Sequence, residues 1–329
     1  MQFKSVKGFT GAGQLAILFV FIGLGLILTS LVQFAIISYI MPPGTGLNDF
    51  AKSATEVLLK PENIYYARLA QVSGTLFLMF IPTILFSLVV NGKNPLWLGF
   101  SKYVNFKQIA LGFAIIFLAS MLAAPLSEIS KEIVANFPDL NTMAKTMEDT
   151  YNKQVVALSN LKSLPEYLMA LIIIAFLPAL FEEMFFRGAI QNLFVKWWRN
   201  PLLAIFATAI IFSLVHMSIY LFVSRLVLGF VLGLMYYRTK NIWVNVIAHF
   251  LNNAIAVTQL YYVSNNKAKI AIDDLDPKVP WWLAIVAFVA LYYVFILLKK
   301  ASAYNRSKII VKEETLYAIG NIHDPFQKI

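Results

Sequence analysis

The chain has 329 residues, of which 59% are hydrophobic and only 13% are charged, whereas charged residues make up about 25% of a typical soluble domain. This composition excludes an ordinary soluble globular protein and indicates a membrane protein. The formal net charge is +10, but the basic residues gather at the ends of apolar segments, where they orient the chain and meet anionic lipid, so no nucleic acid is expected as a partner.

Apolar blocks of about 20 residues recur along the chain, and a helix of that length crosses a bilayer core roughly 30 Å thick. The sequence therefore predicts an all-α fold, a polytopic bundle of about eight transmembrane helices. The first helix is too long for a secretory signal and is expected to be a retained anchor. In chain order the expected spans are Leu15–Ile40, Leu69–Val90, Ile109–Leu126, Tyr167–Ile190, Leu202–His216, Phe222–Tyr237, Trp243–Val263 and Trp281–Leu298.

The loops between these spans carry the orientation signal, because lysine and arginine mark cytoplasmic loops. The bases concentrate in alternate loops, which predicts an integral, multi-pass protein of the plasma (inner) membrane with both termini in the cytoplasm. The polar stretch Ser127–Leu164 then lies on the outer face and is expected to form one or two amphipathic helices broken near Pro138. A solvated connector is the favoured role for it, and a lid is the alternative.

Two features of the later spans bear on helix packing. Gly229 and Gly233 form a GxxxG in the sixth span, which is typical of closely packed membrane helices. Pro178 lies one turn before the two glutamates of the fourth span and is expected to kink that helix and open its backbone.

Polar and ionisable residues inside the later spans are the chemically unusual feature, since an Asp or Arg there costs roughly 2.5–3.5 kcal/mol. Glu183 and Arg187 share a helix face and can pair, whereas Glu182 points about 100° away and stays available. A glutamate can deprotonate water for attack on a carbonyl, and His249 and Asn253 can stabilise the oxyanion. The predicted site residues are Glu182, Glu183, Arg187, His216, His249 and Asn253.

Each of these residues also has a structural interpretation. The Glu183–Arg187 pair can be purely structural, His216 can cap a helix, and the polar groups of the seventh span can be interhelical hydrogen-bond partners. Two other functions stay open, a proton- or ion-coupled transporter and a non-enzymatic immunity or scaffold membrane protein. The transporter predicts acids or broken helices in both halves, and the first three spans have no ionisable residue in their interiors.

Three motifs resemble the signatures of the CPBP family, the CAAX-protease and bacteriocin-processing membrane proteins that are also called the Abi family. "EEMFFR" (Glu182–Arg187) resembles EExxxR, "FSLVH" (Phe212–His216) resembles FxxxH, and "HFLNN" (His249–Asn253) resembles HxxxN. The similarity covers about Leu164 to Val263. It implies an all-helical intramembrane endopeptidase, similar to type II CAAX prenyl proteases, that acts on a membrane-embedded or lipid-associated peptide or protein in the bilayer.

The resemblance also implies roles for single residues. Glu182 would be the general base and would work with His216, while His249 and Asn253 would form the oxyanion site and Glu183 and Arg187 would support them. The family is often described as metal-dependent, and Glu182, His216 and His249 could bind Zn²⁺; a glutamate mechanism without metal is the alternative. The chain has no cysteine, which excludes thiolate ligands.

The expected spans, together with the resemblance over the core, predict a division of the chain into four parts. These are N-terminal transmembrane helices over residues 1–126, a polar outer segment over 127–166, a CPBP-like catalytic core over 167–263, and a last transmembrane helix with a cytoplasmic basic tail over 264–329.

The expected spans conflict with a shared site in one respect. At about 1.5 Å per residue, Glu182 lies roughly 22 Å from the outer start of its span and His216 roughly 21 Å from the inner start of the next. The two spans run in opposite directions through a core about 30 Å thick. The two side chains are therefore expected to differ in depth by more than about 10 Å.

Overall fold

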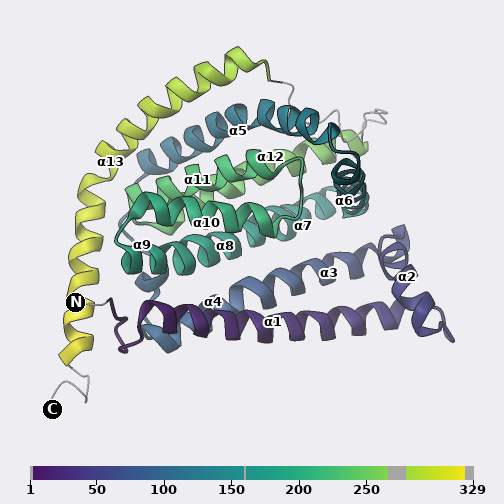
Figure 1. The fold of residues 1–329 in the computed structure, drawn as a ribbon, viewed down its shortest axis with the longest axis horizontal. Coiled ribbons are helices and arrows are strands. Elements are labelled where there is room, and N and C mark those ends of the chain that lie inside the picture. Colours follow the sequence, from purple (N-terminus) through teal and green to yellow (C-terminus); the bar gives the residue numbers. More distant parts are fainter. Residues whose placement is uncertain (1–2, 159–160, 266–278, 323–329) are drawn as a thin grey trace.

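The computed structural model describes residues 3–158, 161–265 and 279–322, and within these residues it contains helices and no strand. The all-α bundle is therefore confirmed (Figure 1). In chain order the α-helices are α1 (Gly11–Ile40), α2 (Leu47–Leu58), α3 (Ile64–Thr75), α4 (Ile81–Val90), α5 (Phe106–Ala135), α6 (Pro138–Leu158), α7 (Leu164–Ala170), α8 (Leu177–Glu183), α9 (Asn192–Trp198), α10 (Pro201–Val215), α11 (Phe222–Thr239), α12 (Ile242–Asn265) and α13 (Trp281–Ile322).

Five helical stretches of the described chain are long and apolar enough to cross a bilayer, so the polytopic prediction holds. The remaining predicted spans, α10, α11 and α12, are also helical but are not among the five. α10 is apolar but has only 15 residues, and α11 and α12 carry polar residues that lower their hydropathy. The five are Gly11–Ile40, Pro61–Val90, Phe106–Ala135, Leu164–Trp198 and Trp281–Ile319.

The stretch Leu164–Trp198 is built from α7, α8 and α9 with two π-helical segments between them, η4 (Leu171–Phe176) and η5 (Met184–Gln191). The first segment ends two residues before Pro178. Proline has no N–H for the regular helical bond, and a widened turn before it lets the helix continue. The expected opening at Pro178 is therefore a local widening inside one long helix.

The GxxxG of α11 packs closely, as predicted. A Cβ atom on Gly233 would lie 2.8 Å from both Gln191 Oε1 and Ile205 Cγ2. The bare backbone also exposes helix carbonyls: Gln191 Nε2 donates to Gly233 O at 2.9 Å, and Arg187 Nη2 donates to Gly229 O at 3.2 Å. The glycines therefore let α11 approach α10 and accept hydrogen bonds from η5.

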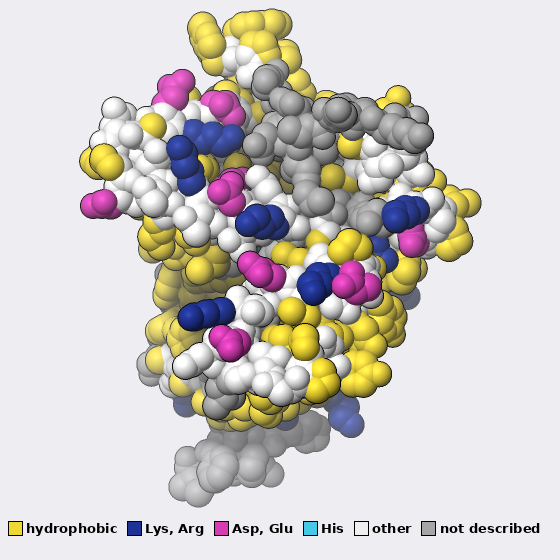
Figure 2. Space-filling model, turned by 90° about the vertical axis from the view of Figure 1, so that its right-hand side faces the viewer, with side chains coloured by type: hydrophobic (Ala, Val, Ile, Leu, Met, Phe, Trp, Pro, Cys, Tyr) yellow, Lys and Arg dark blue, Asp and Glu magenta, His cyan; other side chains and the backbone are white. Residues whose placement is uncertain are grey.

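The outer segment contains the expected break, because α5 ends at Ala135 and α6 begins at Pro138. Helix α6 packs on the turn between α10 and α11, where Tyr220 Oη donates to Asn141 Oδ1 at 2.6 Å and Ser218 Oγ donates to Glu148 Oε2 at 3.2 Å. The end of the molecule that carries α2 and α6 shows basic and acidic side chains side by side (Figure 2). This mixture is what the orientation argument expects of an outer face.

Helix α13 runs along α5 and then across the end of the bundle as one helix of 42 residues (Figure 1). The predicted basic tail is thus largely helical and docked, because Glu313 bridges Lys196 and Lys240 at 2.5 and 2.7 Å. The start of α1 and the end of α13 lie at the same end of the bundle. Residues 266–278 and 323–329 of this predicted part lie outside the described residues.

Substituting Gly233→Ala is expected to destabilise the protein by about 1–3 kcal/mol, because the added methyl group overpacks the contact with Gln191 and Ile205. Thermal unfolding in detergent measures the change. Gly23→Ala in α1 is the matched control, since a Cβ there meets nothing within 4 Å. Equal melting temperatures for the two variants would contradict the packing argument.

Candidate active site

The structure brings the predicted residues together from separate helical elements. Glu182 and Glu183 end α8, Arg187 lies in η5, His216 follows the last residue of α10, and His249 lies in the first half of α12. His216 Nε2 and His249 Nε2 lie 3.8 and 3.9 Å from Glu182 Oε2. The expected separation in depth between Glu182 and His216 is therefore wrong.

The correction follows from where the helices begin and end. The helix that carries Glu182 continues to Trp198 rather than ending at Ile190, so Glu182 lies roughly 24 Å from its basic end at about 1.5 Å per residue. α10 starts at Pro201 directly after the reversal, where Arg199 has a left-handed φ of 54°. Because α10 has 15 residues and runs antiparallel to the preceding helix, His216 lies roughly 22 Å from the same basic end. Both side chains thus reach the same depth.

Glu183 is fully buried, and hydrogen bonds hold both of its oxygens. Oε1 accepts from Arg187 Nη1 at 2.7 Å and lies 3.0 Å from His249 Nδ1, while Oε2 accepts from Asn245 Nδ2 at 3.0 Å. The guanidinium carbon of Arg187 also lies 4.9 Å from the ring centroid of Phe212. The predicted Glu183–Arg187 pair is therefore the centre of a network that joins three helices.

Asn245 is a member of this network that the sequence argument did not identify. Its side chain is fully buried and also donates to Leu232 O at 2.8 Å. The available signal was spacing, because Asn245 precedes His249 by one helical turn just as Asn253 follows it. Asn253 itself is half-buried and makes no side-chain hydrogen bond within the described part of the chain.

Both histidines have their tautomers set by a partner on Nδ1. His216 Nδ1 lies 2.7 Å from the carbonyl oxygen of Phe212, and a carbonyl can only accept, so the proton is on Nδ1. His249 Nδ1 faces the carboxylate of Glu183, which is ionised beside Arg187, so it also donates. Each neutral imidazole therefore presents the lone pair of Nε2 to Glu182.

Three lone-pair atoms consequently converge at the centre of the site. Glu182 Oε2 is buried and has no hydrogen-bond partner in the described structure, and the two Nε2 atoms that face it are acceptors when the imidazoles are neutral. Such an arrangement calls for a hydrogen-bond donor or a cation between them. The side chains of His216, Glu182 and His249 are 26%, 13% and 10% exposed, so the opening of the site lies on the side of His216.

The same donors suit zinc in their chemistry, but their geometry does not. No group of three His, Cys, Asp or Glu side chains within residues 3–158, 161–265 and 279–322 has the arrangement of a metal site. Zinc ligands at roughly 2.0–2.2 Å from the ion lie closer to each other than the 3.8 and 3.9 Å found here. The zinc site at Glu182, His216 and His249 stays a prediction, and no step below depends on it.

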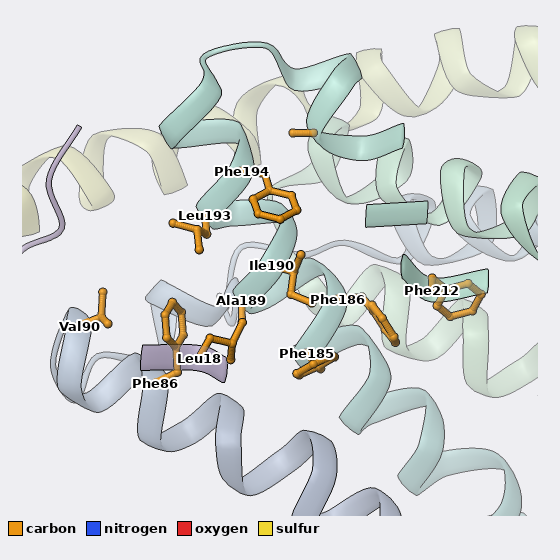
Figure 3. Close-up of a cluster of buried hydrophobic side chains, with 11 residues drawn as sticks. Leu18, Phe86, Val90, Phe185, Phe186, Ala189, Ile190, Leu193, Phe194 and Phe212 are labelled. Atoms are coloured by element: carbon orange, nitrogen blue, oxygen red, sulfur yellow. The ribbon is translucent and has the colours of Figure 1, made fainter. Parts of the chain in front are cut away.

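An apolar cluster surrounds η5 and α9, with further side chains from α1, α4 and α10 (Figure 3). Phe212 packs edge-on against Phe186 with ring centroids 5.1 Å apart and lies 4.4 Å from the ring of His216. Phe212 therefore has the packing role that the sequence indicates. Its backbone carbonyl adds a second role, because it orients His216.

Comparison with known proteins agrees with this geometry. Residues 164–255 match the family described as type II CAAX prenyl endopeptidase Rce1-like, and all the predicted site residues fall within that range. "Uncharacterized protein YpbD" of Bacillus subtilis (strain 168) is 29% identical over 125 residues, which cover 36% of this chain and 59% of that protein. No solved structure matches. Residues 164–255 are therefore similar to an Rce1-like CAAX prenyl endopeptidase domain, and they lie in a chain with five helices long and apolar enough to cross a membrane in its described residues.

Substituting Arg187→Met is expected to destabilise the protein by about 3–5 kcal/mol, because it leaves the buried Glu183 carboxylate uncompensated. Adding Glu183→Gln to this variant should recover part of the loss. The free energy of unfolding in mixed micelles measures both effects. As a control, Lys131→Met breaks the exposed Lys131–Glu128 pair and should cost about 0–1 kcal/mol. Similar losses of stability for Arg187→Met and Lys131→Met would contradict the role of Arg187 as the counter-charge of Glu183.

Proposed function

We propose that this chain is an intramembrane endopeptidase that hydrolyses a peptide bond of a membrane-embedded or lipid-associated protein or peptide. The observation that carries the proposal is the convergence of the Nε2 atoms of His216 and His249, at 3.8 and 3.9 Å, on Glu182 Oε2, which is buried without a hydrogen-bond partner in the described structure. The match of residues 164–255 to a prenyl endopeptidase family supports the same class of reaction.

A water molecule between the three atoms would satisfy them. It donates one hydrogen to Glu182 and the other to an imidazole Nε2, and ordered water in proteins typically has two to four such partners. As the water oxygen attacks the carbonyl carbon of the substrate, Glu182 takes its proton as general base. His216 holds the water in line, because its own orientation is set by the carbonyl of Phe212.

The oxyanion that forms needs N–H donors. Asn253 has an uncommitted amide one turn beyond His249, and we assign it to the oxyanion. We assign the same role to His249 Nε2, which can donate to the oxyanion when the ring carries a hydrogen there. Glu182 then passes the proton from water to the leaving nitrogen, the C–N bond breaks, and an acid and an amine are released.

The fold and the positions of the basic residues support an orientation of the protein in the membrane. We place the end of the bundle that holds the start of α1 and the end of α13 in the cytoplasm of a plasma-membrane protein, supported by Lys196, Lys240 and the other bases there. The site then lies roughly 20–25 Å from that end along the helices, at membrane depth. A substrate must therefore reach it from the bilayer or through the outer surface.

Substituting Glu182→Gln is expected to abolish proteolysis, because the amide cannot take a proton from water. New protein termini, identified by mass spectrometry, should appear in cells that make the wild type and be absent with the variant at equal membrane levels. Glu128→Gln, at an exposed glutamate, is the matched control and should give the wild-type termini.

Other outcomes of this comparison identify the alternatives. Termini that are absent from cells without the protein but persist with Glu182→Gln would overturn the mechanism. If cells that make the wild type, the variant or neither give the same termini, with both proteins folded, the chain is a transporter or a non-enzymatic scaffold rather than a protease. A proton-coupled transporter would still lose its transport with Glu182→Gln, whereas a scaffold would keep its function.

Treating the purified protein with 1,10-phenanthroline is expected to leave cleavage of the identified substrate unchanged, because the mechanism uses no metal. A known zinc peptidase treated in parallel checks that the chelator works. Inactivation that added Zn²⁺ reverses would establish instead that Glu182, His216 and His249 rearrange to hold the ion.

A further inference from the structure

Asn245 is a buried amide that the proposed reaction does not use directly. We propose that Asn245 is a positioning residue, which holds the second oxygen of Glu183 so that the first oxygen fixes the orientation and tautomer of His249. This inference rests on the proposed function, because His249 matters to the reaction only if water is activated at its Nε2.

The orientation of the Asn245 amide is determined by its neighbours. Nδ2 has acceptors on both of its hydrogens, Glu183 Oε2 at 3.0 Å and Leu232 O at 2.8 Å. Turning the amide over would place an oxygen against both acceptors and lose both bonds. Its Oδ1 is buried without a hydrogen-bond partner in the described structure. The fold thus leaves Asn245 Oδ1 unsatisfied so that Nδ2 can donate to both Glu183 and Leu232, which indicates that these two hydrogen bonds contribute more than the one that is lost.

The two oxygens of Glu183 divide their partners. Arg187 and His249 both meet Oε1, and Asn245 is the side chain that donates to Oε2. Arg187 and His249 hold Oε1 and Asn245 holds Oε2, so the Glu183 carboxylate cannot rotate about the bond that joins it to the rest of its side chain. Removing the amide frees Oε2 in a fully buried place, and the carboxylate can then turn towards Arg187 and away from His249.

The consequence for His249 is geometric. While Glu183 Oε1 holds Nδ1, Nε2 points at the space beside Glu182. A His249 that loses this partner can turn, and its Nε2 then no longer faces the place where the substrate reacts. Asn245 therefore acts on the reaction through Glu183 and His249, without touching the substrate.

Substituting Asn245→Asp tests this with a pH signature. The introduced carboxyl has nearly the same shape but can donate to Glu183 only when it is protonated. The charged and titratable groups that face this place are Glu182, Glu183, Arg187, His216 and His249. At neutral pH the variant should lose about tenfold or more in kcat with little change in KM. The loss relative to wild type should shrink as the pH falls.

The matched control is Asn252→Asp on the same helix. Asn252 accepts from Ser120 Oγ at 3.0 Å and contacts none of the groups around Glu183. Its pH profile should keep the wild-type shape. If the profile of Asn245→Asp follows that of Asn252→Asp, or if its kcat/KM stays within about twofold of wild type across the pH range, the positioning role is overturned.

A second measurement separates this inference from the proposed function. In the folded state, the neighbouring carboxylate favours the protonated form of the introduced carboxyl, so the melting temperature of Asn245→Asp should approach that of wild type as the pH falls. A wild type without proteolytic activity would refute the protease, while a shift that is larger for Asn245→Asp than for the same substitution in a Glu183→Gln background would still show that residue 245 faces an ionised Glu183. A constant difference in melting temperature would refute that contact.

The test holds even where the introduced charge prevents folding. Asn245→Ala removes the donation without adding a charge, and it should lower kcat by about tenfold while KM is unchanged. A folded Asn245→Ala with wild-type kcat would overturn the proposal on its own.

Discussion

The buried ion pair between Glu183 and Arg187 is the interaction on which the rest of the site depends. Burying two charges is costly unless each also finds hydrogen bonds, and here every partner comes from a different place in the chain. Arg187 donates to the carbonyl of Gly229 in α11, and Glu183 is bonded from α12 by Asn245 and His249. One ion pair therefore connects the long helix Leu164–Trp198 to α11 and α12. The GxxxG of α11 allows the close approach by which the Arg187 guanidinium reaches the backbone oxygen of Gly229.

The helices differ in apolar content, and the shorter or more polar ones carry the two histidines of the site. Helices α11 and α12 contact several of the helices that can cross a bilayer by their own apolar content. Helix α10 packs mainly on α11 and stops after 15 residues, so that its C-terminal end places His216 beside Glu182. Helix α6 covers the turn that follows, through Asn141 and Glu148. A helix end at membrane depth is tolerated because its free carbonyls find partners, among them Phe212 O with His216 and His216 O with Arg225.

Much of this arrangement is readable from the residues, and the exceptions have physical causes. The helical class, the pairing of Glu183 with Arg187 and the close packing at Gly229 follow from composition and spacing along single helices. The depth of His216 was misjudged because apolar residues continue past Ile190 into a basic end, and hydropathy does not show where such a helix stops. Asn245 was missed because its spacing of one turn from His249 does not show whether its amide faces Glu183 or bonds within its own helix.

The sequence by itself determined that the chain is a membrane protein and that the ionisable residues within its spans lie in the later ones, because both properties depend on composition. It also determined which of these residues share a helix face, because that depends on a period of about 3.6 residues. Only the tertiary structure decided that the Nε2 atoms of two histidines face one carboxylate oxygen. The tautomer of His249 depends on Glu183, which is 66 positions away, and that of His216 depends on a helix ending at that residue. Contacts between distant segments carry no periodic signal, so they become visible only when the helices are packed.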